Sequence, residues 1–209
     1  MSDHKPVHAS RESEKSVQMA RATAERTIQS AALSREVVRG TRLRLQIERL
    51  AERCYAAPPK TAAESARILE ELLLGVMTCC EAPMGNLQVV DKSSGALSIR
   101  VHRGFQEPFL KYFAQVHEGA ACATAFEQAG PVAVDDVATS PLYSTGARRA
   151  MLDAGARSCQ SVALVPRGRK KLGVLSVHYR QPGVTEARRQ MLAALAPQIG
   201  QVVELCSHP

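Results

Sequence analysis

The sequence predicts an α+β fold in which long helices flank a mainly antiparallel sheet. Residues 10–55 contain no proline and one glycine, Gly40, and good helix formers dominate them. After residue 83 the period of the apolar residues changes from that of a helix to that of a strand. The expected strands come in pairs that short turns join, which favours antiparallel neighbours.

The amino-acid composition argues against a nucleic-acid-binding protein. The chain has 209 residues, of which 45% are hydrophobic but only 4% aromatic, with no Trp. This length suits one domain with an appendage, and its core offers few platforms for stacking bases. The net charge of +7 arises mainly in residues 1–60, where Lys and Arg outnumber Asp and Glu by 12 to 7. We expect a solvated helix there rather than a surface for nucleic acid or anionic lipid.

The termini and the cysteines indicate a cytoplasmic protein. No stretch approaches the roughly 18 apolar residues of a membrane span, and the opening sequence MSDHKPVHASRESEK lacks the apolar core of a secretory signal. The six cysteines are therefore expected to be reduced thiols. Their spacing matches no zinc-binding pattern, so no metal centre is expected.

The first expected element is a long helix over residues 12–57, preceded by a disordered tail, residues 1–11. Its apolar residues form two registers that meet near Gly40. The first register comprises Val17, Ala24, Ile28, Ala31, Val38 and Leu45, and the second comprises Leu43, Ile47, Leu50 and Cys54. The stripe is narrow, as in a seam between two helices, so we expect a self-associating, coiled-coil-like segment rather than a buried helix.

A second helix and a hairpin follow the break at Pro58-Pro59. Thr61 and Glu64 have the spacing of a capping box, which predicts a helix start. The expected inward face of this helix comprises Ala62, Ala66, Leu69, Leu73, Val76, Met77 and Cys80. Residues 84–90 and 96–101 then alternate as strands around the turn DKSSG.

The remaining elements are expected in the order helical insert, strand, loop, short helix, two strands and final helix. Helical patches at 106–116 and 119–129 lead to a strand at 131–134, and a brief helix stops at Gly155. Strands at 158–166 and 171–179 are joined by the basic turn RGRK. The last helix starts at Thr185-Glu186, and Pro197 is expected to kink it. The apolar run of the last strand predicts burial on both faces, with the insert covering the second face.

Five motifs occur in the order seen in GAF domains: Met84–Val90, His102–Phe105, Gly119–Cys122, Val134–Ala138 with Pro141-Leu142, and Lys171–Arg180. Residues 61–206 thus resemble a GAF domain, in particular the GAF sensory modules of bacterial sensor histidine kinases. The resemblance implies a six-stranded antiparallel sheet and a small-molecule pocket under the insert between residues 104 and 157.

The resemblance also implies dimerisation through the first and last helices. We expect a homodimer through Leu43, Ile47, Leu50, Leu69, Leu73 and the C-terminal helix. Because the chain ends at Pro209, directly after the domain, its output is expected to pass through a signalling-protein partner or the N-terminal helix.

His178 is the first candidate for ligand binding. Alternation places Val174, Ser176 and His178 on one face of the last strand. Its place at the strand end favours a hydrogen bond to a neighbouring loop, and contact with a ligand is the alternative.

The other candidates for ligand binding are Cys122, Asp136, Tyr143, Arg148 and Gln160. Cys122 lies at an expected helix start, where a thiolate or an anion is stabilised, although close packing among small residues is favoured. Asp136 suits backbone hydrogen bonds in a loop, and Arg148 suits an anion. The sequence names neither the ligand nor a cofactor.

The motifs of several related functional classes are missing. Bilin attachment typically uses Cys followed by His, but Cys122 and Cys159 are followed by Ala and Gln. The Asn-Lys-x-x-Phe pattern of cyclic-nucleotide-binding modules is absent, and the loop DDVATSPLYSTG lacks the second cysteine of free methionine sulfoxide reductases. No Ser–His–acid arrangement is defensible.

We therefore expect a non-enzymatic sensory module that signals through a helical dimer. Two alternatives stay open. One is a thiol-based redox sensor or reductase centred on Cys122, with Cys159 as a second thiol. The other is a haem-binding sensor that uses His102, His117 or His178.

Overall fold

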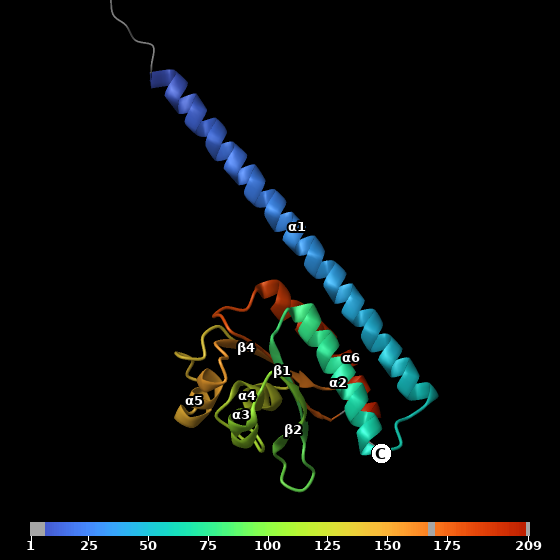
Figure 1. Cartoon of the computed structure of the whole chain (residues 1–209). Coiled ribbons are helices and arrows are strands. Elements are labelled where there is room, and N and C mark those ends of the chain that lie inside the picture. Colours follow the sequence, from blue (N-terminus) through green and yellow to red (C-terminus); the bar gives the residue numbers. More distant parts are fainter. Residues whose placement is uncertain (1–6, 167–169, 208–209) are drawn as a thin grey trace, which may run out of the picture. The chain divides into compact units, whose positions relative to one another are not determined.

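The computed structural model describes residues 7–166 and 170–207 (Figure 1). The chain divides into two units, Met1–Arg39 and Gly40–Pro209, and the second contains the whole sheet. Helix α1 (Val7–Ala56) contributes residues to both units and begins earlier than the expected residue 12. Residues 1–6 of the expected tail, and residues 167–169 of the expected basic turn, lie outside the described residues.

The sheet is antiparallel throughout and has the order β2-β1-β5-β4-β3. Its strands are β1 (Met84–Val90), β2 (Leu97–Arg103), β3 (Pro131–Val134), β4 (Ser158–Leu164) and β5 (Gly173–Tyr179). All five agree with the segments that the period of two indicates. The short strand β3 starts with Pro131 at one edge, where a missing N–H costs no ladder hydrogen bond.

The prediction of six strands is wrong, because the described residues form a five-stranded sheet. At the free edge of β2 the pairing is reduced to one isolated bridge between Leu97 and Val116. Each of these residues donates its backbone N–H to the other's carbonyl, at 2.9 and 3.0 Å. Three residues later Gly119 has a φ of +72°, and the chain turns into a helix instead of continuing along the edge.

Helix α2 (Ala62–Cys80) begins at the predicted cap. The Thr61 hydroxyl accepts a hydrogen bond from the Glu64 N–H at 3.1 Å. The Glu64 carboxylate accepts from the Lys60 N–H at 2.7 Å, one residue before the position expected for a capping box. Both bonds supply partners to backbone groups that the helix itself leaves unpaired.

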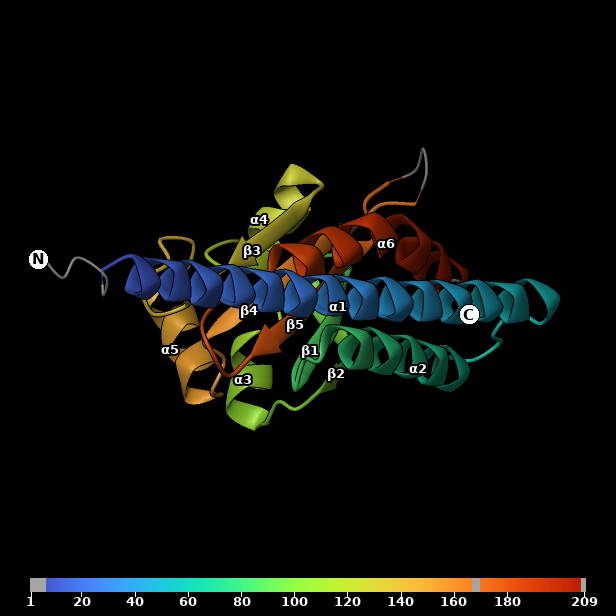
Figure 2. The same cartoon turned by 90° about the horizontal axis from the view of Figure 1, so that it is seen from above.

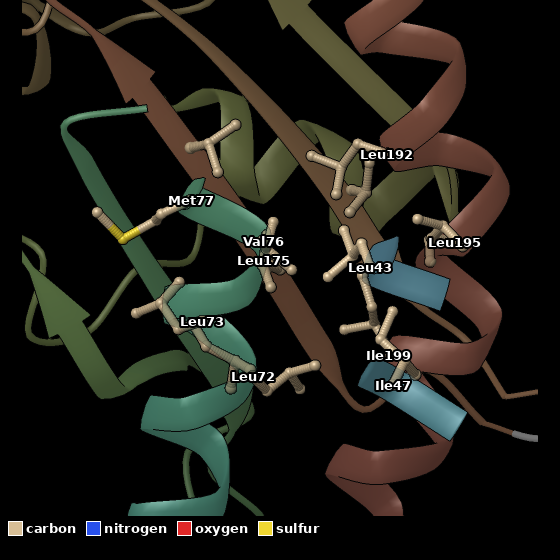
Figure 3. Packing of buried hydrophobic residues seen from close by; sticks show 14 of the residues in the cluster. Leu43, Ile47, Leu72, Leu73, Val76, Met77, Leu175, Leu192, Leu195 and Ile199 are labelled. Atoms are coloured by element: carbon tan, nitrogen blue, oxygen red, sulfur yellow. The ribbon is translucent and has the colours of Figure 1, made fainter. Parts of the chain in front are cut away.

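One face of the sheet is covered by α2, α6 (Glu186–Leu205) and the part of α1 after Gly40 (Figure 2). Thr185 caps α6, and Pro197 lies inside it. In Figure 3, Leu43 and Ile47 of α1 lie among side chains of α6, with α2 and Leu175 beside them. The narrow stripe of the second register is therefore the contact of α1 with its own domain.

This packing overturns the prediction that these residues form a homodimer interface. The five residues are at most 5% exposed within a single chain; they are Leu43, Ile47, Leu50, Leu69 and Leu73. A side chain that is already buried has no apolar surface left to remove from water when a second chain binds.

The other face of the sheet is covered by the insert, as predicted. It contains α3 (Glu107–Tyr112), α4 (Ala121–Gln128) and α5 (Thr145–Asp153) (Figure 1). A second cluster of buried apolar side chains lies between these helices and the sheet. Every residue of β4 and β5 is buried as a result. The prediction of burial on both faces is confirmed.

The docking of α1 predicts a difference between two neighbouring residues. We expect Ile47→Ala, which empties a position that is 1% exposed, to lower the free energy of unfolding by about 2–5 kcal/mol. Leu45→Ala is the matched control, because Leu45 is 48% exposed and should change stability by less than about 0.5 kcal/mol. Urea unfolding followed by circular dichroism measures both. Equal small effects would contradict the packing of α1 on α6.

Candidate functional site

A row of buried polar side chains crosses the face of the sheet that lies under the insert. Its members are at most 4% exposed; they are Asn86 and Gln88 of β1, Ser161 of β4, and Ser176 and His178 of β5. The register explains why they meet: Asn86 and Ser161 both lie opposite Ser176 on neighbouring strands. Since alternate residues share a face, Gln88 and His178 belong to the same row.

The insert closes over this row and leaves a small cavity, which we call the polar chamber. Its volume is about 10 Å³. The roof comes from Phe109 of α3, Phe113, the start of α4, and Met151 of α5. A space of this size holds at most about one water molecule, so the chamber is closed in this structure.

Hydrogen bonds pair only part of the row. His178 Nε2 lies 3.1 Å from Asn86 Oδ1, and the Ser161 and Ser176 hydroxyls are 2.8 Å apart. Both amide atoms of Gln88, and His178 Nδ1, have no nitrogen or oxygen partner within the described residues. The Gln88 amide interacts with the Cys122 sulfur, a weak acceptor, and this contact slightly opposes the rise in the pKa of that thiol. A buried polar atom without a partner costs about 1–3 kcal/mol. The chamber thus holds unused hydrogen-bonding capacity at three atoms.

The chamber carries no charge. Burial lowers the pKa of His178 to about 3, so its ring is neutral at physiological pH. Burial raises the pKa of Cys122 to about 11 and that of Cys159 to about 12, and it also raises the pKa of Tyr143. All four groups are therefore protonated or neutral, and the chamber suits uncharged polar groups.

Three of the six predicted site residues line the chamber: Cys122, Tyr143 and His178. The Tyr143 hydroxyl lies 3.0 Å from the Cys159 sulfur. The expected hydrogen bond of His178 to a neighbouring loop is wrong, because its partner Asn86 is in strand β1. The rings of Phe105 and Phe109 lie nearly perpendicular to the His178 ring, with centroids 5.0 and 6.1 Å from it.

The other three predicted residues do not line the chamber. Asp136 accepts from the Ala138 N–H at 3.0 Å and forms an ion pair with Arg157, which fixes the loop after β3.

Arg148 donates to the Ser140 carbonyl at 2.7 Å within the insert. Gln160 lies on the opposite face of the sheet, where it donates to the Arg189 carbonyl of α6 at 2.9 Å.

The sequence interpretation missed Asn86, Gln88 and Phe109. Asn86 and Gln88 alternate with Leu87 and Val89, which is also the pattern of a strand with one face in water. The signal that both faces are covered lies in β5, the neighbouring strand, whose apolar run indicates burial. Considering β1 and β5 together would have predicted that Asn86 and Gln88 are buried.

The structure offers little support for a metal or haem site. No group of three or more His, Cys, Asp or Glu within the described residues could hold a metal ion. His102 and His117 are exposed, while His178 is buried and paired with Asn86. No helix in the described part of the chain is long and apolar enough to cross a membrane.

The match to a protein-family model decides the family. The model of the GAF domain matches residues 62–204. The chain belongs to the GAF domain family. The polar chamber lies inside this domain, between the sheet and the insert.

Solved GAF domains share the fold at low sequence identity. A domain of a protein assigned as a two-component sensor histidine kinase from Sinorhizobium meliloti 1021 is 17% identical, with a TM-score of 0.55 over 66% of this chain and 89% of that one. The GAF domain of a phosphoenolpyruvate-protein phosphotransferase from Coxiella burnetii is 14% identical, with a TM-score of 0.60 over 79% and 94%.

An enzyme is also among the similar structures. The free methionine-R-sulfoxide reductase from Neisseria meningitidis, solved with its substrate, is 18% identical, with a TM-score of 0.59 over 80% of this chain and 91% of that one. No curated protein matches the sequence significantly. At these identities the likeness shows the fold alone.

The thiol of Cys122 provides a pH-dependent test of the GAF chamber. With a pKa of about 11, roughly one part in a thousand is thiolate at pH 8, and the fraction rises about tenfold per pH unit. We expect its alkylation by iodoacetamide to rise about tenfold per unit between pH 7.5 and 9.5, as followed by peptide mass spectrometry. The same cysteine in urea should level off near pH 9. A plateau near pH 8 in the folded protein would show a stabilised thiolate and favour the redox alternative.

Proposed function

We propose that the chain is a non-enzymatic, cytoplasmic sensory GAF module that takes an uncharged polar group of a small molecule into the polar chamber. The observation that carries the proposal is the set of three unpaired atoms on Gln88 and His178. A ligand with matching donors and acceptors gains from pairing atoms that otherwise remain buried and unsatisfied. The six cysteines, none of which forms a disulfide, support a reducing compartment.

Occupation of the chamber requires movement of its roof, because a volume of about 10 Å³ excludes any organic ligand. The roof consists of short helices and loops, whereas the floor consists of central strands. Binding would therefore change the insert, and a sensor needs such a difference between bound and free states.

The redox alternative rests on the similar fold of the methionine-R-sulfoxide reductase. Two observations favour a binding module over it. Cys122 and Cys159 have raised pKa values because they are buried, whereas a reactive cysteine needs thiolate character. Cys159 is also engaged by the Tyr143 hydroxyl.

The ligand is best sought in the protein itself. We expect native mass spectrometry of the purified chain, followed by denaturing extraction, to reveal a bound small molecule. Gln88→Leu should keep the fold but lose that molecule, because leucine fills a similar volume without the donor and acceptor. Extracted ligand added back should raise the melting temperature of the wild type and not that of Gln88→Leu.

Gln160→Leu is the matched control, since it makes the same change on an adjacent part of the sheet but on the opposite face. It should lose some stability and retain the ligand. Equal retention by both variants would refute the chamber as the ligand site.

We also propose that the response leaves the domain through α1, by pairing with a second copy of the chain and contact with a signalling partner. The first apolar register supports this, because Val17, Ile28 and Val38 are at least 50% exposed. Exposed apolar residues at heptad-like spacing are typical of a helix that associates with another. Because other positions of the register hold alanine, the pairing is expected to depend mainly on these three larger residues.

The pairing is tested by Ile28→Lys combined with Val38→Lys. We expect the double variant to be monomeric at low micromolar concentration, where the wild type is dimeric, because each lysine places a charge in the seam. Multi-angle light scattering gives the mass, and the control carries lysine at the exposed polar positions Gln18 and Gln29. If the double variant stays as dimeric as the control, α1 does not carry self-association.

A further inference from the structure

An open groove lies on the outside of the insert, between α3 and α5. Its volume is about 570 Å³, which is within the range of about 300–1,000 Å³ typical of small-molecule sites. Phe109 and Tyr112 of α3 form one wall, Arg149 and Ala150 of α5 form the other, and Arg180 at the end of β5 lies at one end. The groove thus combines aromatic surface with two guanidinium groups and one carboxylate, that of Asp153.

The place of the Tyr112 ring in the groove depends on Gly146. A Cβ at this position would lie 2.6 Å from the Tyr112 hydroxyl, so a larger residue would displace the Tyr112 ring from its place in the groove wall. Gly146 has ordinary helical geometry within α5, which makes closeness to Tyr112, rather than backbone conformation, the constraint.

The cations of the groove are available to an anion. Arg180 makes no hydrogen bond or ion pair with the described residues, and its guanidinium lies against the turn at Gly155, where a Cβ would approach it to 2.9 Å. Arg149 lies 3.6 Å from Asp153, but both side chains are more than 60% exposed. Such a pair contributes about 0–1 kcal/mol and yields readily to a ligand carboxylate.

One side chain is shared by the groove and the polar chamber. Phe109 lines both cavities. Its ring stacks on Phe105 at 3.7 Å and meets the His178 ring edge-on at 6.1 Å.

We infer that the groove and the chamber form one binding site for a small organic carboxylate with an uncharged, amide-like group at its other end. The carboxylate is held by Arg149 and Arg180, and the uncharged end passes Phe109 to reach Gln88 and His178. This inference rests on the proposed function, because it requires the chamber to accept a ligand.

The two ends of the site select this class of ligand because the groove favours a negative charge and the chamber favours an uncharged group. A dianion would place a charge in a desolvated chamber that has no charged partner for it. A wholly neutral molecule would leave the guanidinium groups without the charge-assisted, bidentate contacts that they form with carboxylates. A monoanion with a neutral donor and acceptor satisfies both ends.

The test uses three probes with the same benzene ring: 4-carbamoylbenzoate, the dianion terephthalate and the neutral terephthalamide. Isothermal titration calorimetry with the full chain should show the carbamoylbenzoate binding at least roughly tenfold more tightly than either relative, the loss expected for one charge-assisted contact. Arg180→Ala should remove that advantage. Arg100→Ala, an exposed arginine on β2 outside the groove, should leave it intact.

A second measurement separates the inference from the proposed function. Saturating carbamoylbenzoate should slow alkylation of Cys122, which lines the chamber, and Phe109→Ala should speed that alkylation in the absence of probe. Slowed alkylation without any effect of Arg180→Ala would overturn the inference and leave the chamber as a ligand site. Binding that depends on Arg180 but leaves Cys122 unprotected would overturn the joined site, while the chamber alone would still be tested by the loss of the co-purified molecule from Gln88→Leu. The inference is also overturned if none of the three probes binds at about 5 mM.

Discussion

The burial of the central strands on both faces is the constraint on which the rest of this structure depends. All residues of β4 and β5 are buried, because α2, α6 and the end of α1 cover one face and the insert covers the other. Every polar side chain on these strands must therefore find a partner inside the protein or remain unsatisfied. The two faces differ in how fully their buried polar side chains are hydrogen-bonded, and the candidate site lies on the face with more unpaired atoms.

On the helical face the demand is small and nearly met. Leu175 and Val177 are apolar, and Gln160 donates to the Arg189 carbonyl, although its own Oε1 has no partner among the described residues. On the face under the insert, five polar residues lie in one row with only two hydrogen bonds among them. The pairing of β1 with β2 shifts register between Leu87 and Gln88, so an irregularity of the ladder lies at the residue with two unpaired atoms. Such irregularities often re-aim side chains beside functional sites.

Local patterns in the sequence predict local structure here and fail where two segments must be combined. The five strands and the cap at Thr61 follow from period and spacing within short segments. The stripe Leu43–Cys54 is equally compatible with a second chain and with the groove between α2 and α6, because both accept a narrow apolar face. The folded structure decides between the two, because α2 and α6 of the same chain already cover the apolar face of α1. The sixth strand was expected from the resemblance alone, and a single backbone bridge at Val116 replaces it.

The alternation along β5 also connects the chamber with the helical layer. Ser176 and His178 face the chamber, while Leu175 and Val177 belong to the apolar cluster that holds Leu43 and Ile47 of α1 (Figure 3). Neighbouring residues of one strand thus touch the two sides that the proposed sensor would have to couple. Because protein interiors are close-packed, a shift of β5 cannot be absorbed by empty space and must be met by the side chains on its other face. The site and the end of α1 are separated by the thickness of one strand, which makes β5 the most direct physical connection between them.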